Sequence, residues 1–155
     1  MRRAHSVHEM RKYLERRSEE KEAVLSVIAR LREQNYLDDA RYAAEFARLH
    51  ANSRRQGRFR IARELRARGV TDRHIEAAVD AVFAETDEAS LVRDRIQRKL
   101  ARMRGSSDAK IDQKNIASLY RSLLAAGFSG DTIRAEIRKA TRTEAAELDE
   151  TRSTS

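Results

Sequence analysis

The chain has 155 residues, of which 40% are apolar and 37% charged, and its formal net charge is +8. It contains no Cys, which excludes disulfides and thiol chemistry, and its apolar runs are too short for a membrane span or a signal peptide. It also lacks Pro, and its commonest residues (Arg, Ala, Glu and Leu) are strong helix formers. The composition therefore predicts an all-α protein of the cytoplasm.

The first expected hairpin of helices lies within residues 1–35. Ser6-x-x-Glu9 is a capping box, which marks a helix start, and Val24 and Ile28 lie on one face of a second helix. No leading helix precedes this hairpin, whereas the later copies described below each have one. Two explanations remain open: the start is truncated, or this protein dispenses with that helix.

Residues 36–86 are expected to form a complete three-helix repeat. Asp38 and Asp39 can cap its first helix. The apolar face of that helix is expected to carry Tyr42, Phe46 and Leu49. The second and third helices carry the apolar pairs Ile61/Leu65 and Ile75/Val79. Between them, Gly69 suits the left-handed position that ends a helix, and Thr71 can cap the next one. So short a turn predicts a helical hairpin.

The same pattern occurs in a third copy, expected over residues 87–142. Asp87 can cap its first helix, and Gly127 recurs at the place of Gly69. Its apolar positions are Val92, Ile96, Leu100, Leu119, Leu123, Ile133 and Ile137. Because one hairpin buries too little surface alone, we expect tandem three-helix repeats stacked into an elongated, possibly curved rod. Residues 143–155 are hydroxyl-rich and acidic without an apolar stripe, so we predict a disordered tail.

Positive charge is concentrated in the first two helices of a repeat. Residues 54–68 hold seven Arg and one acid, and residues 93–104 hold five Arg, one Lys and one acid. A charged face can be solvated surface only, but two basic runs favour one shared face that attracts phosphates or an acidic protein. Phe59 could stack on a base, although packing in the core is the preferred interpretation. The predicted contact residues are Arg54, Arg55, Arg58, Arg60, Arg63, Arg66, Arg95, Arg98, Lys99 and Arg102.

The sequence offers no catalytic or metal site. His5 and His8 have no further ligands nearby, and the other two His residues are isolated. The five Gly form no phosphate-binding loop, and no Ser lies in a nucleophile elbow. An Asp in the first turn of each candidate recognition helix, Asp72 and Asp131, disfavours base reading by a helix-turn-helix. We therefore expect no enzyme, no metal and no cofactor.

Two segments of the second copy resemble the signature of the RecX family, the regulators of the RecA recombinase. They are Tyr36-Leu37-Asp38-Asp39-x-Arg41-Tyr42-x-x-x-Phe46 and Arg60-Ile61-x-x-Glu64-Leu65-x-x-Arg68-Gly69-Val70. The resemblance extends over residues 6–140. It departs from the family at Gly57-Arg58-Phe59, where Gly-Pro is usual, and at the missing first helix.

The resemblance implies a modulator of RecA, usually an inhibitor, that lies in the groove of the RecA–DNA filament. Such proteins limit ATPase, strand exchange and co-protease activity. The expected partner is the RecA nucleoprotein filament, with single- or double-stranded DNA as a further contact of the basic face, and we expect a monomer that uses no membrane. Two alternatives remain open: a sequence-indifferent DNA-binding helical module that acts without RecA, and a helical adaptor for another acidic partner.

Overall fold

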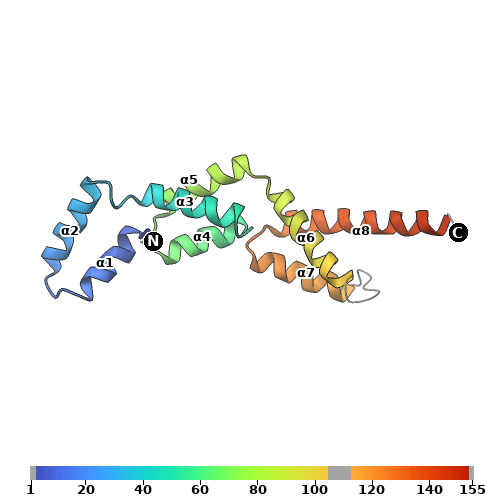
Figure 1. Cartoon of the computed structure of the whole chain (residues 1–155), viewed down its shortest axis with the longest axis horizontal. Helices are drawn as coiled ribbons and strands as arrows, with labels where there is room; N and C mark the ends of the chain where they lie inside the picture. Colours follow the sequence, from blue (N-terminus) through green and yellow to red (C-terminus); the bar gives the residue numbers. More distant parts are fainter. Residues whose placement is uncertain (1–2, 105–112, 154–155) are drawn as a thin grey trace. The chain divides into compact units, whose positions relative to one another are not determined.

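The computed structural model describes residues 3–104 and 113–153, and within them it contains helices and no strands (Figure 1). The helices are α1 (Val7–Glu15), α2 (Lys21–Glu33), α3 (Asp39–Asn52), α4 (Arg58–Ala67), α5 (Asp72–Glu85), α6 (Glu88–Arg104), α7 (Gln113–Ala125) and α8 (Gly130–Ser153). None of them, in the described part of the chain, is long and apolar enough to cross a bilayer. The predicted all-α class is confirmed.

The chain folds as two compact units. Unit 1 comprises Met1–Arg54 and Ile61–Glu85, and unit 2 comprises Arg55–Arg60 and Thr86–Ser155. Unit 1 thus holds α1, α2, α3, α5 and most of α4, whereas the first turn of α4 belongs with α6, α7 and α8. The predicted repeat boundaries at 35/36 and 86/87 both fall between helices.

The helix starts follow the local sequence signals. The Ser6 side chain accepts from the Glu9 N–H while the Glu9 side chain accepts from the Ser6 N–H, which completes the predicted capping box. Asp38 caps α3 through the Arg41 N–H at 3.1 Å, and Asp87 accepts from the Ala89 N–H at 3.2 Å. These helices therefore begin where their first-turn hydrogen-bond donors find a side-chain acceptor.

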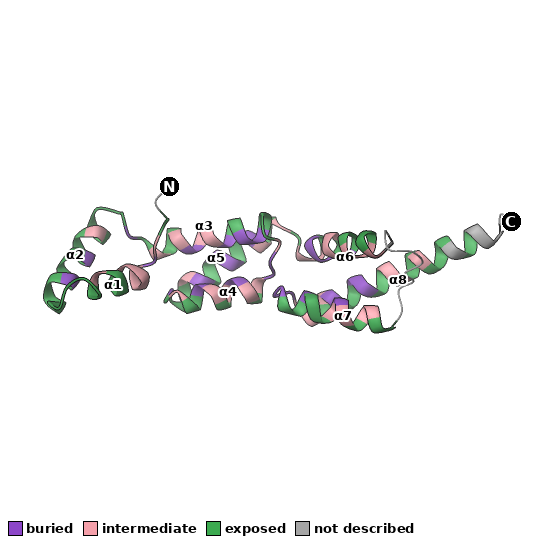
Figure 2. Cartoon of the chain, turned by 60° about the horizontal axis from the view of Figure 1, so that its bottom comes forward, coloured by how far each residue is buried: buried purple, intermediate pink, exposed green. Residues whose placement is uncertain are grey.

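The core of unit 1 lies mainly between α3, α4 and α5, where buried residues face one another (Figure 2). On α3 the buried stripe is Ala43, Ala47 and Ala51, which face Ile75, Ala78, Val79 and Val82 of α5. Small side chains let two helix axes approach closely. The predicted apolar face of α3 was therefore right only in part: Tyr42 and Phe46 are partly buried and pack against this core, whereas Leu49 is 52% exposed.

The α1–α2 hairpin packs around Val24, Ile28 and Leu37 and is anchored to the rest of unit 1 by its first residues. Ser6 Oγ donates to the carbonyl oxygen of Arg68 at 2.6 Å, and the Val7 N–H donates to Asp39 Oδ1 at 2.9 Å. Hydrogen-bond donors at the start of α1 are thus satisfied by acceptors just after α4 and at the beginning of α3.

In unit 2, Gly57 and the first turn of α4 make hydrogen bonds to the third repeat, as the start of α1 does to the second repeat in unit 1. The Gly57 N–H donates to the Ala126 carbonyl at 2.8 Å, and the Phe59 N–H donates to the Gly127 carbonyl at 3.0 Å. The Arg58 N–H donates to the carboxylate of Glu88, the first residue of α6. The same arrangement, a helix start bound to a Gly turn and to an acid at the next helix start, thus occurs in both units.

The core of unit 2 joins α6, α7 and α8. Its buried apolar residues are Leu91, Val92, Ile96, Leu119, Leu123, Ala126, Phe128, Ile133 and Ile137. The prediction of a disordered tail from residue 143 was wrong for the described residues, because α8 continues to Ser153. No Gly or Pro interrupts this segment, and extending an anchored helix adds one hydrogen bond for each residue fixed.

Candidate functional site

The backbone of Arg55–Arg60 is held tightly against the third repeat, and this places several predicted contact residues in unit 2. A Cβ atom on Gly57 would overlap the backbone of Gly127 and Phe128, so this approach requires Gly. Arg55 has a positive φ of 52°, which turns the chain into α4. Of the predicted cations, Arg55, Arg58 and Arg60 lie in this segment, whose backbone is thereby held within unit 2 together with α6.

Three of the predicted cations act on a fourth, Arg95 of α6, and we call Arg55, Arg60, Arg95 and Arg98 the arginine cluster. Burial lowers the pKa of Arg95, and the positive charges of Arg60, Arg55 and Arg98 lower it further. Arg remains charged at neutral pH in any case, and the three neighbouring cations add a positive local potential to the effect of burial. The Arg95 guanidinium also lies over the Phe128 ring, 6.0 Å from its centroid.

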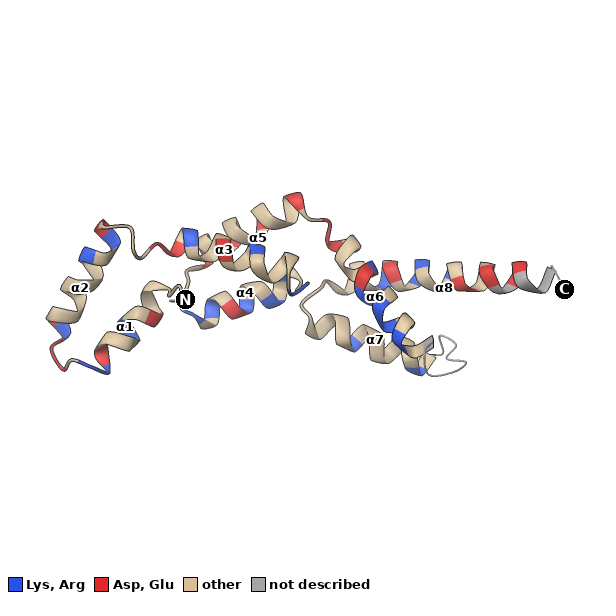
Figure 3. Ribbon diagram, in the orientation of Figure 1, with Lys and Arg blue, Asp and Glu red and all other residues tan. Residues whose placement is uncertain are grey.

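Within the cluster, some hydrogen-bonding capacity is used inside the protein. Arg55 forms a salt bridge with Asp94 on the same helix as Arg95. Arg60 Nη1 donates to the Ala125 carbonyl at 3.5 Å, a long contact. Arg98 is exposed, whereas Arg55, Arg60 and Arg95 are half-buried. The cluster is therefore a positioned set of guanidinium groups rather than a random surface distribution, and Figure 3 shows Lys and Arg along α4 and α6.

The remaining predicted contact residues lie in different settings. In unit 2, Lys99 donates to Ser118 Oγ at 3.4 Å, Arg102 is exposed, and Arg58 is half-buried beside Glu88. In unit 1, Arg66 donates to Asp72 Oδ1 through Nε at 3.0 Å and Nη2 at 2.8 Å. Arg54 and Arg63 are also exposed in unit 1. That all ten predicted residues share one face stays a prediction.

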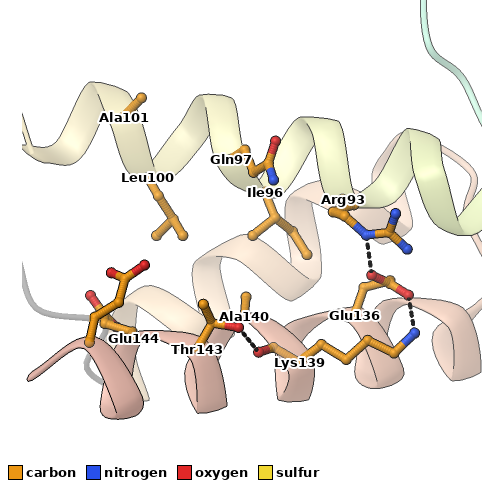
Figure 4. A pocket seen from close by; sticks show the side chains of 11 residues that line it. Arg93, Ile96, Gln97, Leu100, Ala101, Glu136, Lys139, Ala140, Thr143 and Glu144 are labelled. Carbon is orange, nitrogen blue, oxygen red and sulfur yellow. Dashed lines mark hydrogen bonds and ion pairs between the residues drawn. The ribbon is translucent and has the colours of Figure 1, made fainter. Parts of the chain in front are cut away.

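A buried acid between α6 and α8 was not among the predicted residues. Glu136 is only 2% exposed and accepts from Arg93 Nε at 3.1 Å and from Lys139 Nζ at 2.8 Å (Figure 4). Burial opposes its ionisation, but the hydrogen bonds from Lys139 and Arg93 outweigh that effect and hold the pKa of Glu136 below its usual value. The signal was present, because Glu136 occupies the repeat position of Ala78, a buried apolar site.

Next to this ion pair, α6 and α8 enclose a cavity of ≈ 440 Å³ lined by both apolar and charged side chains. Ile96 and Leu100 line it from α6 (Figure 4). A second cavity in unit 1, of ≈ 470 Å³, is lined by Tyr42, Phe46 and His50 together with Arg54 and Arg68. Phe46 stacks on His50 with ring centroids 3.7 Å apart, so each of these two rings packs one face against the other.

The described residues contain no group of His, Asp and Glu side chains that could hold a metal ion. His8 packs against Gly69, and His50 lies 3.7 Å from Glu64 through Nδ1. What the fold and the site define is a helical-repeat protein that presents a fixed cluster of guanidinium groups.

Comparisons with known proteins identify the family to which this helical-repeat protein belongs. A family model described as "RecX, second three-helix domain" matches residues 38–79. A regulatory protein RecX of Stenotrophomonas maltophilia (strain R551-3) is 33% identical over 134 residues, which are 86% of this chain and 77% of that protein. One from Halorhodospira halophila is 34% identical over 137 residues, 86% of this chain and 78% of that protein. The chain belongs to the RecX family of regulatory proteins.

Other matches extend the comparison. The regulatory protein RecX of Halalkalibacterium halodurans is 30% identical over 131 residues, and the match spans 84% of this chain but only 47% of that protein. The crystal structure of RecX from Lactobacillus salivarius has a TM-score of 0.73 at 23% identity and covers 88% of this chain and 86% of that one. That likeness confirms the fold.

Proposed function

We propose that this chain binds the RecA nucleoprotein filament in the cytoplasm and restrains it, acting as a binding protein without catalysis. Membership of the RecX family carries the proposal, and the arginine cluster supports it. A filament on DNA carries phosphates, and a positive potential strengthens binding to phosphates and to acidic side chains alike. Arg forks suit both groups because they present paired donors in one plane.

In this proposal the ten predicted cations contact the filament, with the arginine cluster contributing most. Arg60 and Arg95 are half-buried, so less side-chain entropy is lost when a bound anion orders them than for fully exposed Arg side chains. Exposed cations such as Arg63 and Arg102 add a weaker, salt-screened attraction. Bound along the groove, the protein would limit ATP turnover, strand exchange and co-protease activity.

The test is RecA ATPase activity on single-stranded DNA with this protein added at less than one molecule per RecA protomer. We expect turnover and strand exchange to fall, because a protein lying in the groove contacts more than one RecA protomer. Heat-unfolded protein at the same concentration serves as the control for the added charge. Unchanged turnover together with unchanged strand exchange would remove this proposal.

A further inference from the structure

Phe59 is exposed, which differs from the packing role that the sequence favoured. Its side chain is 60% exposed even though its backbone is fixed by the hydrogen bond from its N–H to the Gly127 carbonyl. The core positions of α4 are filled instead by Ile61 and Leu65, both fully buried. A large apolar ring held at the surface by a rigid backbone is a candidate contact for a partner.

The segment that carries this ring is rich in Arg. Arg58 and Arg60 flank Phe59 in the chain, and Arg60 belongs to the arginine cluster with Arg55, Arg95 and Arg98. Figure 3 shows the positive charge on the first turn of α4 and on α6, both parts of unit 2. The segment Arg55–Arg60 therefore presents one aromatic ring among several positive charges.

Single-stranded nucleic acid complements both features at once. Its phosphates match guanidinium groups, and its unpaired bases offer flat faces that stack on aromatic side chains. A duplex keeps its bases stacked inside, and an acidic protein segment supplies carboxylates without a flat face for each residue. We propose that Phe59 stacks on an unpaired base while the arginine cluster holds the neighbouring phosphates, so that unit 2 binds single-stranded nucleic acid without sequence preference.

This inference rests on the proposed function only for its setting, since the RecA filament contains a nucleic-acid strand. The binding itself requires no RecA. It can therefore fail while the action on RecA holds, or hold while the action on RecA fails. Measurements on bare oligonucleotides keep the two proposals apart.

The absence of Trp from the chain makes a direct test possible. Phe59→Trp introduces a single Trp at the proposed stacking position, and stacking on a base quenches indole fluorescence. We expect a 15-nucleotide oligo(dT) to quench this emission in a saturable way. Tyr36→Trp is the matched control, because Tyr36 is 73% exposed but lies in unit 1, outside the arginine cluster. Its emission should stay nearly constant at the same oligonucleotide concentrations.

Affinity measurements complete the test. Phe59→Ala and Phe59→Leu should each raise the Kd for oligo(dT) on the order of tenfold, because Leu keeps apolar bulk but loses the flat ring. Inorganic polyphosphate should bind both variants as it binds the wild-type protein. Quenching equal at positions 59 and 36, or full oligo(dT) affinity in Phe59→Leu, would overturn the stacking role. If the wild-type protein and the Phe59 variants differ in affinity for oligo(dT) but not for duplex DNA, that result supports the stacking role.

Discussion

At Gly57 two backbone segments of unit 2 lie in close contact, and the role of this residue is steric. The Cβ atom of an Ala there would overlap the carbonyl group of Gly127 and the N–H of Phe128. Backbone atoms cannot move aside as a side-chain end can, so the Gly57 and Phe59 hydrogen bonds must lengthen or break. We expect Gly57→Ala to lower the free energy of unfolding by about 1–3 kcal/mol, measured by thermal or urea unfolding.

Gly130→Ala is the control for this prediction. The Cβ atom at Gly130 would meet only the ends of the Tyr120 and Arg134 side chains, and the position lies at the start of α8, where Ala is a better helix former. Its stability should change little or rise. Equal destabilisation by the two substitutions would contradict the steric account of Gly57.

Residues whose role depends on nearby sequence were the predictable ones. Ser6, Asp38 and the positive-φ Gly69 act on their own helix ends, so spacing alone identified them. Phe59 and Glu136 were not predicted, because the exposure of one and the burial of the other depend on which segment packs against them. The arginine cluster was predictable in part. Charge density identified its members among ten candidate contact residues, but only the fold shows which four of the ten act on one another.

At the scale of the helix, the central element is α4, which carries the basic first turn at one end and the core of unit 1 along the rest. Leu65 is fully buried there, whereas Leu49 on α3 is 52% exposed. Leu65→Ala removes buried apolar volume and leaves a cavity, so it should cost about 2–5 kcal/mol of stability. Leu49→Ala removes the same atoms from a solvent-exposed place and should cost well under 1 kcal/mol. Chemical denaturation of both variants measures the difference, and similar costs would show that α4 does not form the core.

The periodicity predicted such packing well where a helix has one buried face, as on α4 and α5. On α3 it was right only in part, because alternative stripes one residue apart both contain apolar side chains. Aromatic residues suggested Tyr42 and Phe46, but close packing against α5 selects the small residues Ala43, Ala47 and Ala51. Side-chain size matters only once the distance between helix axes is known.

The contact between α6 and α8 includes the Glu136 ion pair, which makes it sensitive to pH. The folded-state pKa of Glu136 lies below the ordinary value of 4.5, so its contribution to stability is fully present above pH 4.5 and is lost as the pH falls through the folded-state value. Glu136→Gln should reduce stability at pH 7 by about 1.5–3 kcal/mol, since charged hydrogen bonds are replaced by weaker ones.

Thermal unfolding of both proteins from pH 7 to pH 3 checks this prediction. The difference in Tm between wild type and Glu136→Gln should shrink as the pH falls below 4.5, because the wild-type carboxylate becomes protonated. Glu144→Gln, further along α8, serves as a control that changes the same group outside the buried ion pair. A Tm difference that stays constant over this range would show that Glu136 does not act through its charge.

For the whole molecule, the placement of charge matters more than its total. A net charge of +8 attracts any polyanion, but at physiological salt charges separated by more than about 8 Å are largely screened. An anion bound at the arginine cluster is therefore influenced mainly by that cluster. Composition alone predicts basic character, whereas the fold brings Arg60 of one repeat close enough to Arg95 of the next for its charge to lower the pKa of Arg95.

Two triple variants with the same net charge separate these effects. Replacing Arg55, Arg60 and Arg98 with Gln neutralises most of the cluster, and replacing Arg11, Arg16 and Arg30 with Gln neutralises exposed cations of the α1–α2 hairpin. Both variants lose three positive charges.

If local potential governs binding, the cluster variant should bind the RecA filament on the order of tenfold more weakly at physiological salt. Its affinity should also depend less steeply on salt, because fewer counterions are displaced. The hairpin variant should stay within about twofold of wild type. Equal losses would mean that total charge governs binding, and the arginine cluster would then have no special part in it.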